Sequence, residues 1–109
     1  MPTIKIVEFL EQGNVSPFRK WFDGLDSIAA AKVTTAIYRL EQGNTSNVKA
    51  VGKGVTEYRI DFGPGYRIYF GQDGDVLIIL LGGGTKKDQS ADIQRAQLRW
   101  QQYKASKKR

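Results

Sequence analysis

The spacing of hydrophobic positions changes along the chain, and these changes predict its elements. Residues 3–10 are apolar and β-branched, which predicts a first strand. Ser16-Pro17 is typical of a helix start, and the apolar residues that follow recur at helical spacing. A second apolar stripe over residues 29–40 predicts another helix that ends near Gly43. The first half of the chain is therefore predicted as a strand followed by two helices.

After a polar loop, the pattern alternates with a period of two over residues 55–62 and again from Tyr66. The glycines and proline of residues 63–65 indicate a three-residue turn, so these two segments are predicted to form a hairpin. Residues 76–81 are apolar on both faces, which predicts a central strand. The three glycines at 82–84 are predicted to end it.

A helical stripe over residues 90–103 predicts a last helix, and residues 104–109 are predicted as a basic, frayed tail. The predicted order is β-α-α-β-β-β-α. This order predicts an α+β fold with a twisted, mainly antiparallel sheet packed against helices. A length of 109 residues is typical of one domain, spanning residues 1–109.

Composition excludes several kinds of chemistry. The chain has no cysteine and no histidine, which excludes disulfides, thiolate or imidazole metal sites and histidine-based catalysis. We expect no metal and no cofactor. The longest apolar run, residues 76–81, is too short to span a membrane, and the N-terminus shows no secretory signal. We therefore expect a soluble cytoplasmic protein without a membrane partner.

The charge is basic and unevenly distributed. Seventeen basic and eleven acidic residues give a net charge of +6. Residues 53–109 hold eleven of the basic and six of the acidic residues, so most of the excess lies there. Such a balance favours nucleic acid or an acidic protein as partner, while a basic tail that only aids solubility is the alternative.

The predicted hairpin brings two arginines together. With a three-residue turn, Asp61 would lie opposite Arg67 and Arg59 opposite Tyr69. Arg59 and Arg67 would then be diagonal neighbours on the polar face, a spacing that suits a phosphate. The alternative is that Asp61 simply pairs with Arg67 across the strands.

Other residues of the second half are candidates for binding RNA. Tyr69 shares the face of the arginines and is predicted to stack on an unpaired base. Lys86 and Lys87 follow the three glycines, although this segment lacks the spacing of a P-loop and a solvated pair of lysines is the alternative. Three further basic residues are assigned to RNA binding: Lys53, Arg95 and Arg99. The aromatic residues at 18, 21 and 22 are predicted to be core.

Two segments carry a family resemblance. Residues 51–70, VGKGVTEYRIDFGPGYRIYF, resemble the RelE/ParE toxin superfamily, and most of all its HigB-like branch of phage-derived addiction-module killer proteins. Residues 80–89, LLGGGTKKDQ, and residues 91–96 support this resemblance. It covers most of the chain and implies the two helices and twisted sheet predicted above.

The resemblance also implies roles for residues. Arg67 matches the arginine that contacts the scissile phosphate in this superfamily, and Arg59 falls near an active-site lysine. Lys86 and Lys87 match a basic loop, and we count Lys87 with the two arginines as catalytic. The sequence departs from the family in two places, because Asp61 replaces a second lysine and Ile93 lies where some members have an acid–base group.

The resemblance implies a toxin of a type II toxin–antitoxin system that cleaves mRNA on the ribosome without a metal. Its implied partners are the ribosome and mRNA, a helix-turn-helix antitoxin encoded by the adjacent gene and, through that antitoxin, operator DNA. The missing acid–base residue favours an alternative, a ParE-like poison of DNA gyrase without RNase chemistry. A third possibility is an inactive relative that binds only its antitoxin and operator DNA.

Overall fold

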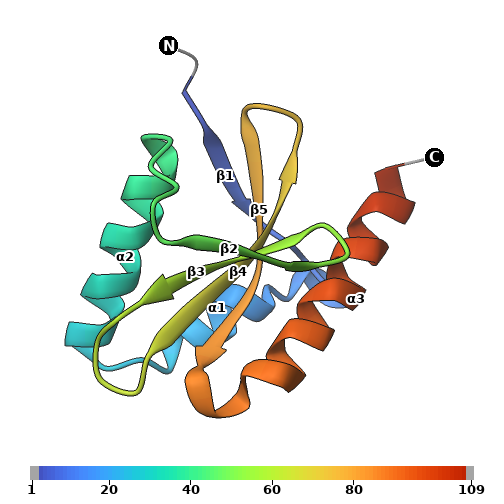
Figure 1. The fold of residues 1–109 in the computed structure, drawn as a ribbon. Helices are drawn as coiled ribbons and strands as arrows, with labels where there is room; N and C mark the ends of the chain where they lie inside the picture. Colours follow the sequence, from blue (N-terminus) through green and yellow to red (C-terminus); the bar gives the residue numbers. More distant parts are fainter. Residues whose placement is uncertain (1–2, 108–109) are drawn as a thin grey trace.

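The computed structural model describes residues 3–107, which form five strands and three α-helices around one sheet (Figure 1). The strands are β1 (Lys5–Glu8), β2 (Val48–Gly52), β3 (Val55–Ile60), β4 (Tyr66–Asp73) and β5 (Leu77–Thr85). The helices are α1 (Pro17–Asp23), α2 (Ser27–Glu41) and α3 (Gln89–Lys107), with short 3-10 turns η1 (Gln12–Asn14) and η2 (Lys86–Asp88). Within residues 3–107, no helix is both long and apolar enough to cross a bilayer.

The sheet has the order β1-β5-β4-β3-β2. β1 pairs with β5 in parallel, and the other three pairs of neighbours are antiparallel. The predicted α+β class with a mainly antiparallel sheet is therefore confirmed. The central position predicted for the last strand is also confirmed, because β5 lies between β1 and β4.

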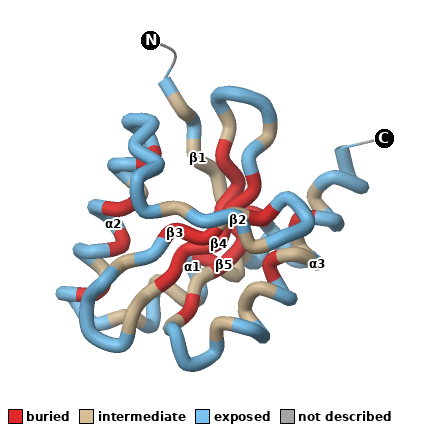
Figure 2. The backbone as a smooth tube through the Cα atoms, in the orientation of Figure 1, coloured by how far each residue is buried: buried red, intermediate tan, exposed pale blue. Residues whose placement is uncertain are grey.

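Helices cover both faces of the sheet. Helices α1 and α2 pack on one face over a buried cluster that includes Phe18, Leu40 and Ile68. Helix α3 packs on the other face over a cluster that includes Leu81 and Trp100. Figure 2 shows that buried backbone is concentrated along the middle strands β3 to β5. The aromatic residues of α1 belong to the first cluster, as predicted.

One strand was missed, and the ends of several predicted elements are wrong. Residues 48–52 were predicted to be part of a loop, but they form β2. An exposed strand at the edge of a sheet does not need alternating apolar residues, so its residues show no strand pattern. β5 continues through the glycines at 82–84, which leave room for helices to approach: a Cβ at Gly83 would overlap the ring of Trp21. Helix α3 continues to Lys107, so the tail predicted at 104–109 is helical over 104–107; residues 108–109 lie outside the described part.

Candidate anion-binding site at one end of the sheet

Arg59 and Arg67 lie directly opposite each other on neighbouring strands. The register of β3 and β4 pairs Arg59 with Arg67 and Ile60 with Tyr66. Directly opposite residues have Cα atoms about 4.5–5.5 Å apart, closer than the diagonal arrangement predicted from sequence. The connection between the strands has five residues, Asp61–Gly65, rather than three. The predicted Asp61–Arg67 pairing is therefore wrong.

Arg67 is paired with a different carboxylate, that of Glu57. The Nε atom of Arg67 lies 3.6 Å from Oε2 of Glu57, and the two side chains are 8% and 0% exposed. The Nη1 atom of Arg67 donates a hydrogen bond of 3.0 Å to the carbonyl of Gly65. The third guanidinium nitrogen of Arg67, Nη2, contacts neither Glu57 nor the carbonyl of Gly65. Within residues 3–107, it is therefore the nitrogen of Arg67 that can bind a ligand.

A buried polar cluster lies behind this ion pair. Gln89, the first residue of α3, donates from Nε2 to Oε2 of Glu57 at 2.8 Å. The hydroxyl of Tyr69 and Oε1 of Glu57 are both enclosed without a hydrogen-bond partner of good geometry in the described chain. Burial, followed by the negative charge of Glu57, raises the pKa of Tyr69 well above its ordinary range. The phenol therefore stays protonated at neutral pH.

This burial changes the role of Tyr69. Its side chain is 0% exposed and belongs to the cluster under α3, so it cannot stack on an RNA base as predicted. Sequence alternation places it on the polar face of the hairpin, but α3 covers that part of the face. Glu57 and Gln89 were missed as members of the site. The alternation of β3 was a usable signal for Glu57, which shares a face with Arg59.

Lys86 and Lys87 complete a group of cations at the carboxyl end of β5. They lie in the η2 turn between β5 and α3, and both are exposed. The amide of Lys86 donates to the carbonyl of Gly65, which also accepts from Arg67. A Cβ at Gly65 would lie 3.1 Å from Nη1 of Arg67 and 3.5 Å from Cβ of Lys86. Gly65 therefore holds Lys86 beside Arg67.

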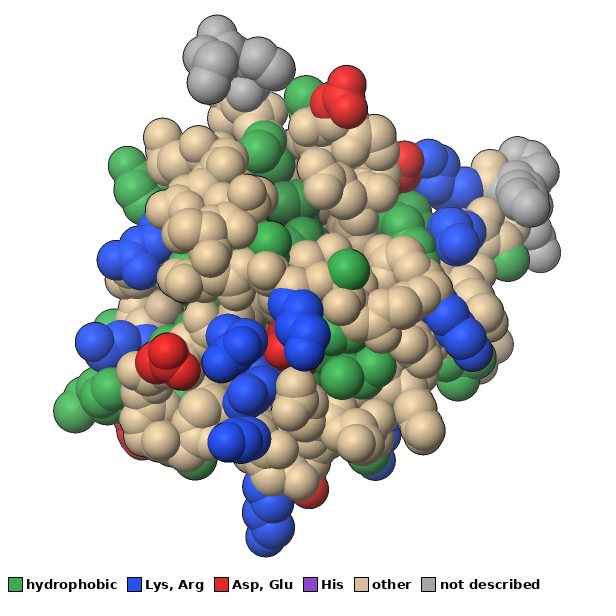
Figure 3. Space-filling view, in the orientation of Figure 1, with side chains coloured by type: hydrophobic (Ala, Val, Ile, Leu, Met, Phe, Trp, Pro, Cys, Tyr) green, Lys and Arg blue, Asp and Glu red, His purple; other side chains and the backbone are tan. Residues whose placement is uncertain are grey.

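We call Arg59, Arg67, Lys86 and Lys87 the cationic site. Arg59, Lys86 and Lys87 are exposed, and no carboxylate of residues 3–107 forms a salt bridge with them. Figure 3 shows Lys and Arg side chains gathered over the sheet and the start of α3. Lys49 of β2, which sequence analysis did not single out, is exposed and paired in register with Glu57. Such a group of uncompensated cations attracts a polyanion.

The comparison with known proteins places the chain in a family. Residues 20–104, which contain every predicted site residue, match the family model of phage-derived Gp49-like proteins. The chain belongs to the Gp49-like family. A protein of Haemophilus influenzae described as uncharacterised is 44% identical over 82 residues, or 74% of this chain and 83% of that protein. The Gp49-like family is one of RelE/HigB-like toxins, so the resemblance drawn from sequence is confirmed. Membership indicates a toxin with an antitoxin partner.

Three predicted RNA-binding residues of this Gp49-like protein lie away from the cationic site. Lys53 is in the β2–β3 turn, two residues before Val55, which is itself four residues or about 13 Å along β3 from Arg59. Arg95 and Arg99 instead line a pocket of about 320 Å³ between α3, α1 and the glycines of β5. The structure thus brings Arg59, Arg67, Lys86 and Lys87 together but separates the other three from them.

The two arginines of α3 are partly neutralised. Arg95 pairs with Asp92 at 3.1 Å, and Arg99 lies 3.6 Å from Glu11 while donating to the carbonyl of Leu81. Burial raises the pKa of Asp92, and the charge of Arg95 opposes this. Because of these ion pairs, the exposed positive charge around Arg95 and Arg99 is weaker than that of the cationic site.

Residues 3–107 contain no group of three or more acidic side chains that could hold a metal ion.

Proposed function

We propose that this protein is a toxin that cleaves mRNA on the ribosome, with the cationic site at the scissile phosphate. One observation carries the proposal: Arg59 and Arg67 are cross-strand partners, with Lys86 held beside Arg67 by Gly65. Two adjacent guanidiniums offer planar donors to the oxygens of one phosphate. Family membership supports the toxin, and the cleavage is the part we propose.

The chemistry proposed is attack of the RNA 2′-hydroxyl on the adjacent phosphorus. A P–O bond forms to the 2′-oxygen, and the bond to the 5′-oxygen of the next nucleotide breaks. The products are a 2′,3′-cyclic phosphate and a free 5′-hydroxyl, with the proton of the 2′-hydroxyl balanced by the proton gained by the leaving oxygen. Negative charge grows on the phosphate oxygens during this step.

The cationic site provides electrostatic stabilisation for that charge. Arg67 is held by Glu57 and by the carbonyl of Gly65, so its guanidinium is oriented before the substrate binds. One preorganised donor of this kind commonly changes a catalytic rate by about 10²–10³-fold. Arg59, Lys86 and Lys87 are exposed and could hold the phosphates of the bound strand.

A gyrase poison without RNase chemistry is the second candidate. The observation that favours it is the burial of Tyr69, because the exposed members of the cationic site are then Arg59, Lys86 and Lys87. Arginine and lysine are charged at neutral pH, so they serve binding more readily than proton transfer.

The deciding experiment expresses the protein in bacteria and maps new 5′ ends of mRNA together with DNA damage. We expect new ends within codons for the unmodified protein, and a cleavage rate about 10²-fold lower for Arg67→Lys, which keeps the charge beside Glu57 but loses the planar donors. Lys5→Ala removes an exposed cation of the edge strand β1, away from the cationic site; it is the matched control and should cleave normally. DNA damage with intact mRNA would establish the gyrase poison instead.

A further inference from the structure

A narrow groove lies between α2 and β3, next to the cationic site but on the side of the sheet that α1 and α2 cover. Its volume is about 160 Å³, below the 300–1,000 Å³ typical of drug-sized ligands but sufficient for a phosphate group. The polar or aromatic residues that line it are Lys32, Thr35, Arg39, Asn47, Tyr58 and Arg59. Arg59 belongs to the cationic site and also borders this groove, so the two regions adjoin at β3.

The groove is positively charged throughout. Lys32, Thr35 and Arg39 recur at the i, i+3, i+7 spacing that places residues on one face of a helix. Their face is turned towards Tyr58 and Ile60 of β3, and Arg59, whose side chain belongs to the opposite face of that strand, borders the groove. No carboxylate lines the groove, and none within residues 3–107 forms a salt bridge with Lys32, Arg39 or Arg59. The neutral lining residues Thr35 and Asn47 can hydrogen-bond an anion.

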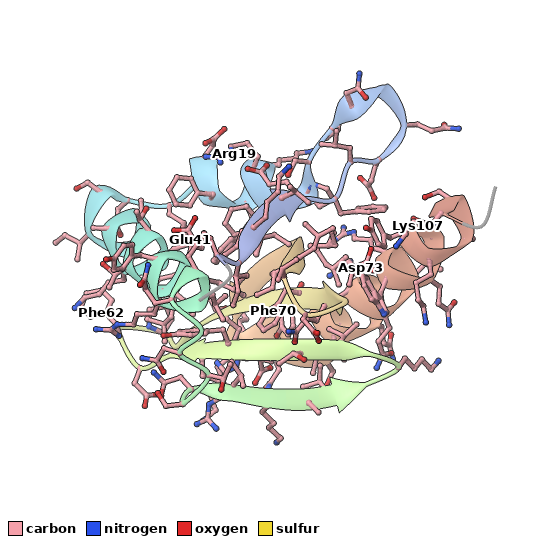
Figure 4. The ribbon with its side chains drawn as sticks, turned by 90° about the horizontal axis from the view of Figure 1, so that it is seen from above. Arg19, Glu41, Phe62, Phe70, Asp73 and Lys107 are labelled. Atoms are coloured by element: carbon pink, nitrogen blue, oxygen red, sulfur yellow. The ribbon has the colours of Figure 1, made fainter. Side chains whose placement is uncertain are left out.

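An exposed aromatic ring lies at the same place. Phe62, in the β3–β4 connection, is 38% exposed, and Nζ of Lys32 lies 5.0 Å from the centroid of its ring. Figure 4 shows Phe62 at the end of the hairpin beneath α2. Uncompensated cations beside an exposed aromatic ring are the combination that single-stranded nucleic acid requires, because the cations hold phosphates and the ring stacks on a base.

We propose that the α2–β3 groove binds the phosphodiester backbone of single-stranded RNA, with a base stacked on Phe62. Lys32 and Arg39 hold phosphates of the strand that passes Arg59, so the groove extends the footprint of the RNA beyond the bond to be cleaved. This inference rests on the proposed function for the identity of the strand. An acidic peptide would use the cations but not the ring, which is why RNA is favoured over a protein partner.

The first test measures the salt dependence of binding to a fluorescent single-stranded RNA of about 12 nucleotides, a length comparable to the sites of known single-strand-binding proteins. Its riboses carry 2′-O-methyl groups, which prevent cleavage by the 2′-oxygen. The slope of log K against log salt should become shallower by about 1.4 in Lys32→Gln/Arg39→Gln, since each phosphate contact contributes about 0.7. Lys5→Gln/Lys104→Gln removes two exposed cations outside the groove and is the matched control. Equal slopes for the two double variants would overturn the proposal.

The second test separates stacking from charge. Phe62→Ala should weaken RNA binding about fivefold or more while leaving the salt slope unchanged, because stacking releases no counterions. Its affinity for a polyglutamate peptide should not change. If the groove variants lose affinity for polyglutamate but not for RNA, the groove binds an acidic protein and the inference is wrong.

The failure of the groove can be distinguished from the failure of the proposed function. The slope of log K against log salt for RNA binding should be the same in Arg67→Lys as in the unmodified protein, because Arg67 does not line the groove. If mRNA stays intact but the Lys32→Gln/Arg39→Gln slope falls, the cleavage proposal fails and the groove stands. If mRNA is cleaved in codons but the slope is unchanged, the groove fails and the cleavage proposal stands.

Discussion

Arg67 lies between a buried carboxylate and the surface where we propose that RNA binds. A side chain on the polar face of a strand can ordinarily be removed with little harm to the fold. Arg67 differs, because it is 7% exposed and neutralises Glu57, which is 0% exposed. Loss of toxicity in an Arg67 variant therefore has two possible physical causes.

Arg67→Ala should lower the free energy of unfolding by about 3–5 kcal/mol, because it leaves the Glu57 carboxylate buried without its partner. Chemical denaturation would measure this effect. Arg59→Ala is the control: the side chain is exposed, so the change should stay within about 0.5 kcal/mol. Equal free energies of unfolding for the two variants would show that the Glu57–Arg67 pair does not stabilise the folded state. Loss of toxicity in Arg67→Ala would then report on function alone.

At the scale of elements, α3 is held against the sheet by close packing over glycine. A Cβ at Gly71 of β4 would overlap the indole of Trp100, which is 5% exposed. The glycine is therefore required by the contact between helix and strand rather than by its own backbone conformation.

Gly71→Ala should destabilise the fold by about 1–3 kcal/mol, since the added methyl group overpacks the contact with Trp100. Gly24→Ala is a suitable comparison, because its Cβ would lie 3.5 Å from the carbonyl of Trp21, an ordinary contact, with the backbone in a right-handed conformation. That variant should be neutral or slightly stabilising. Thermal unfolding of both proteins provides the measurement, and a neutral Gly71→Ala would show that α3 can move away from β4.

The last turns of α3 are joined to β4 by polar contacts. The hydroxyl of Tyr103 donates to Asp73 at 2.7 Å, and the ammonium of Lys107 binds the same carboxylate (Figure 4). Burial, followed by the hydrogen bond to Asp73, raises the pKa of Tyr103 to about 12. These contacts explain why the helix continues beyond the apolar stripe visible in the sequence.

A raised phenol pKa makes the stability of the protein fall at alkaline pH. Below pH 10 the phenol is protonated in both states; between about pH 10 and 12 the unfolded state loses its proton first, so unfolding becomes more favourable. Tyr103→Phe should reduce this loss, whereas Tyr38→Phe, at a 59% exposed position, should not. Denaturation from about pH 9 to pH 12 would test the difference, and parallel curves for all three proteins would contradict the pKa assigned to Tyr103.

At the scale of the whole molecule, a net charge of +6 favours an acidic partner segment on the antitoxin. We expect the association rate with the protein encoded by the adjacent gene to fall markedly as salt is raised, because exposed charges are screened over about 8–10 Å near physiological salt. Stopped-flow mixing over a range of salt concentrations would measure this rate. An association rate that does not change with salt would contradict the electrostatic contribution. Absence of binding would show that these two proteins do not form a toxin–antitoxin pair.

The strongly periodic elements were predictable from sequence because their side-chain pattern is itself the cause of their structure. The stripe of α2 and the apolar run of β5 each bury an apolar face. β2 lacks such a pattern, because it lies at the edge of the sheet with most of its residues exposed, and it was missed. The members of the cationic site could be predicted, since Arg59, Arg67, Lys86 and Lys87 were all singled out from sequence.

The α+β class, the family and the positively charged second half of the chain could be predicted from the amino-acid sequence, because they depend on local periodicity, motif and composition. The partner of Arg67, the burial of Tyr69 and the distance of Lys53, Arg95 and Arg99 from the site became clear from the folded structure. These depend on the length of the β3–β4 turn, which shifts the register of the hairpin by two residues, and on where α3 crosses the sheet. The turn is local, but its glycines and proline fit a loop of three residues as well as one of five; the position of α3 depends on packing between residues far apart in the chain.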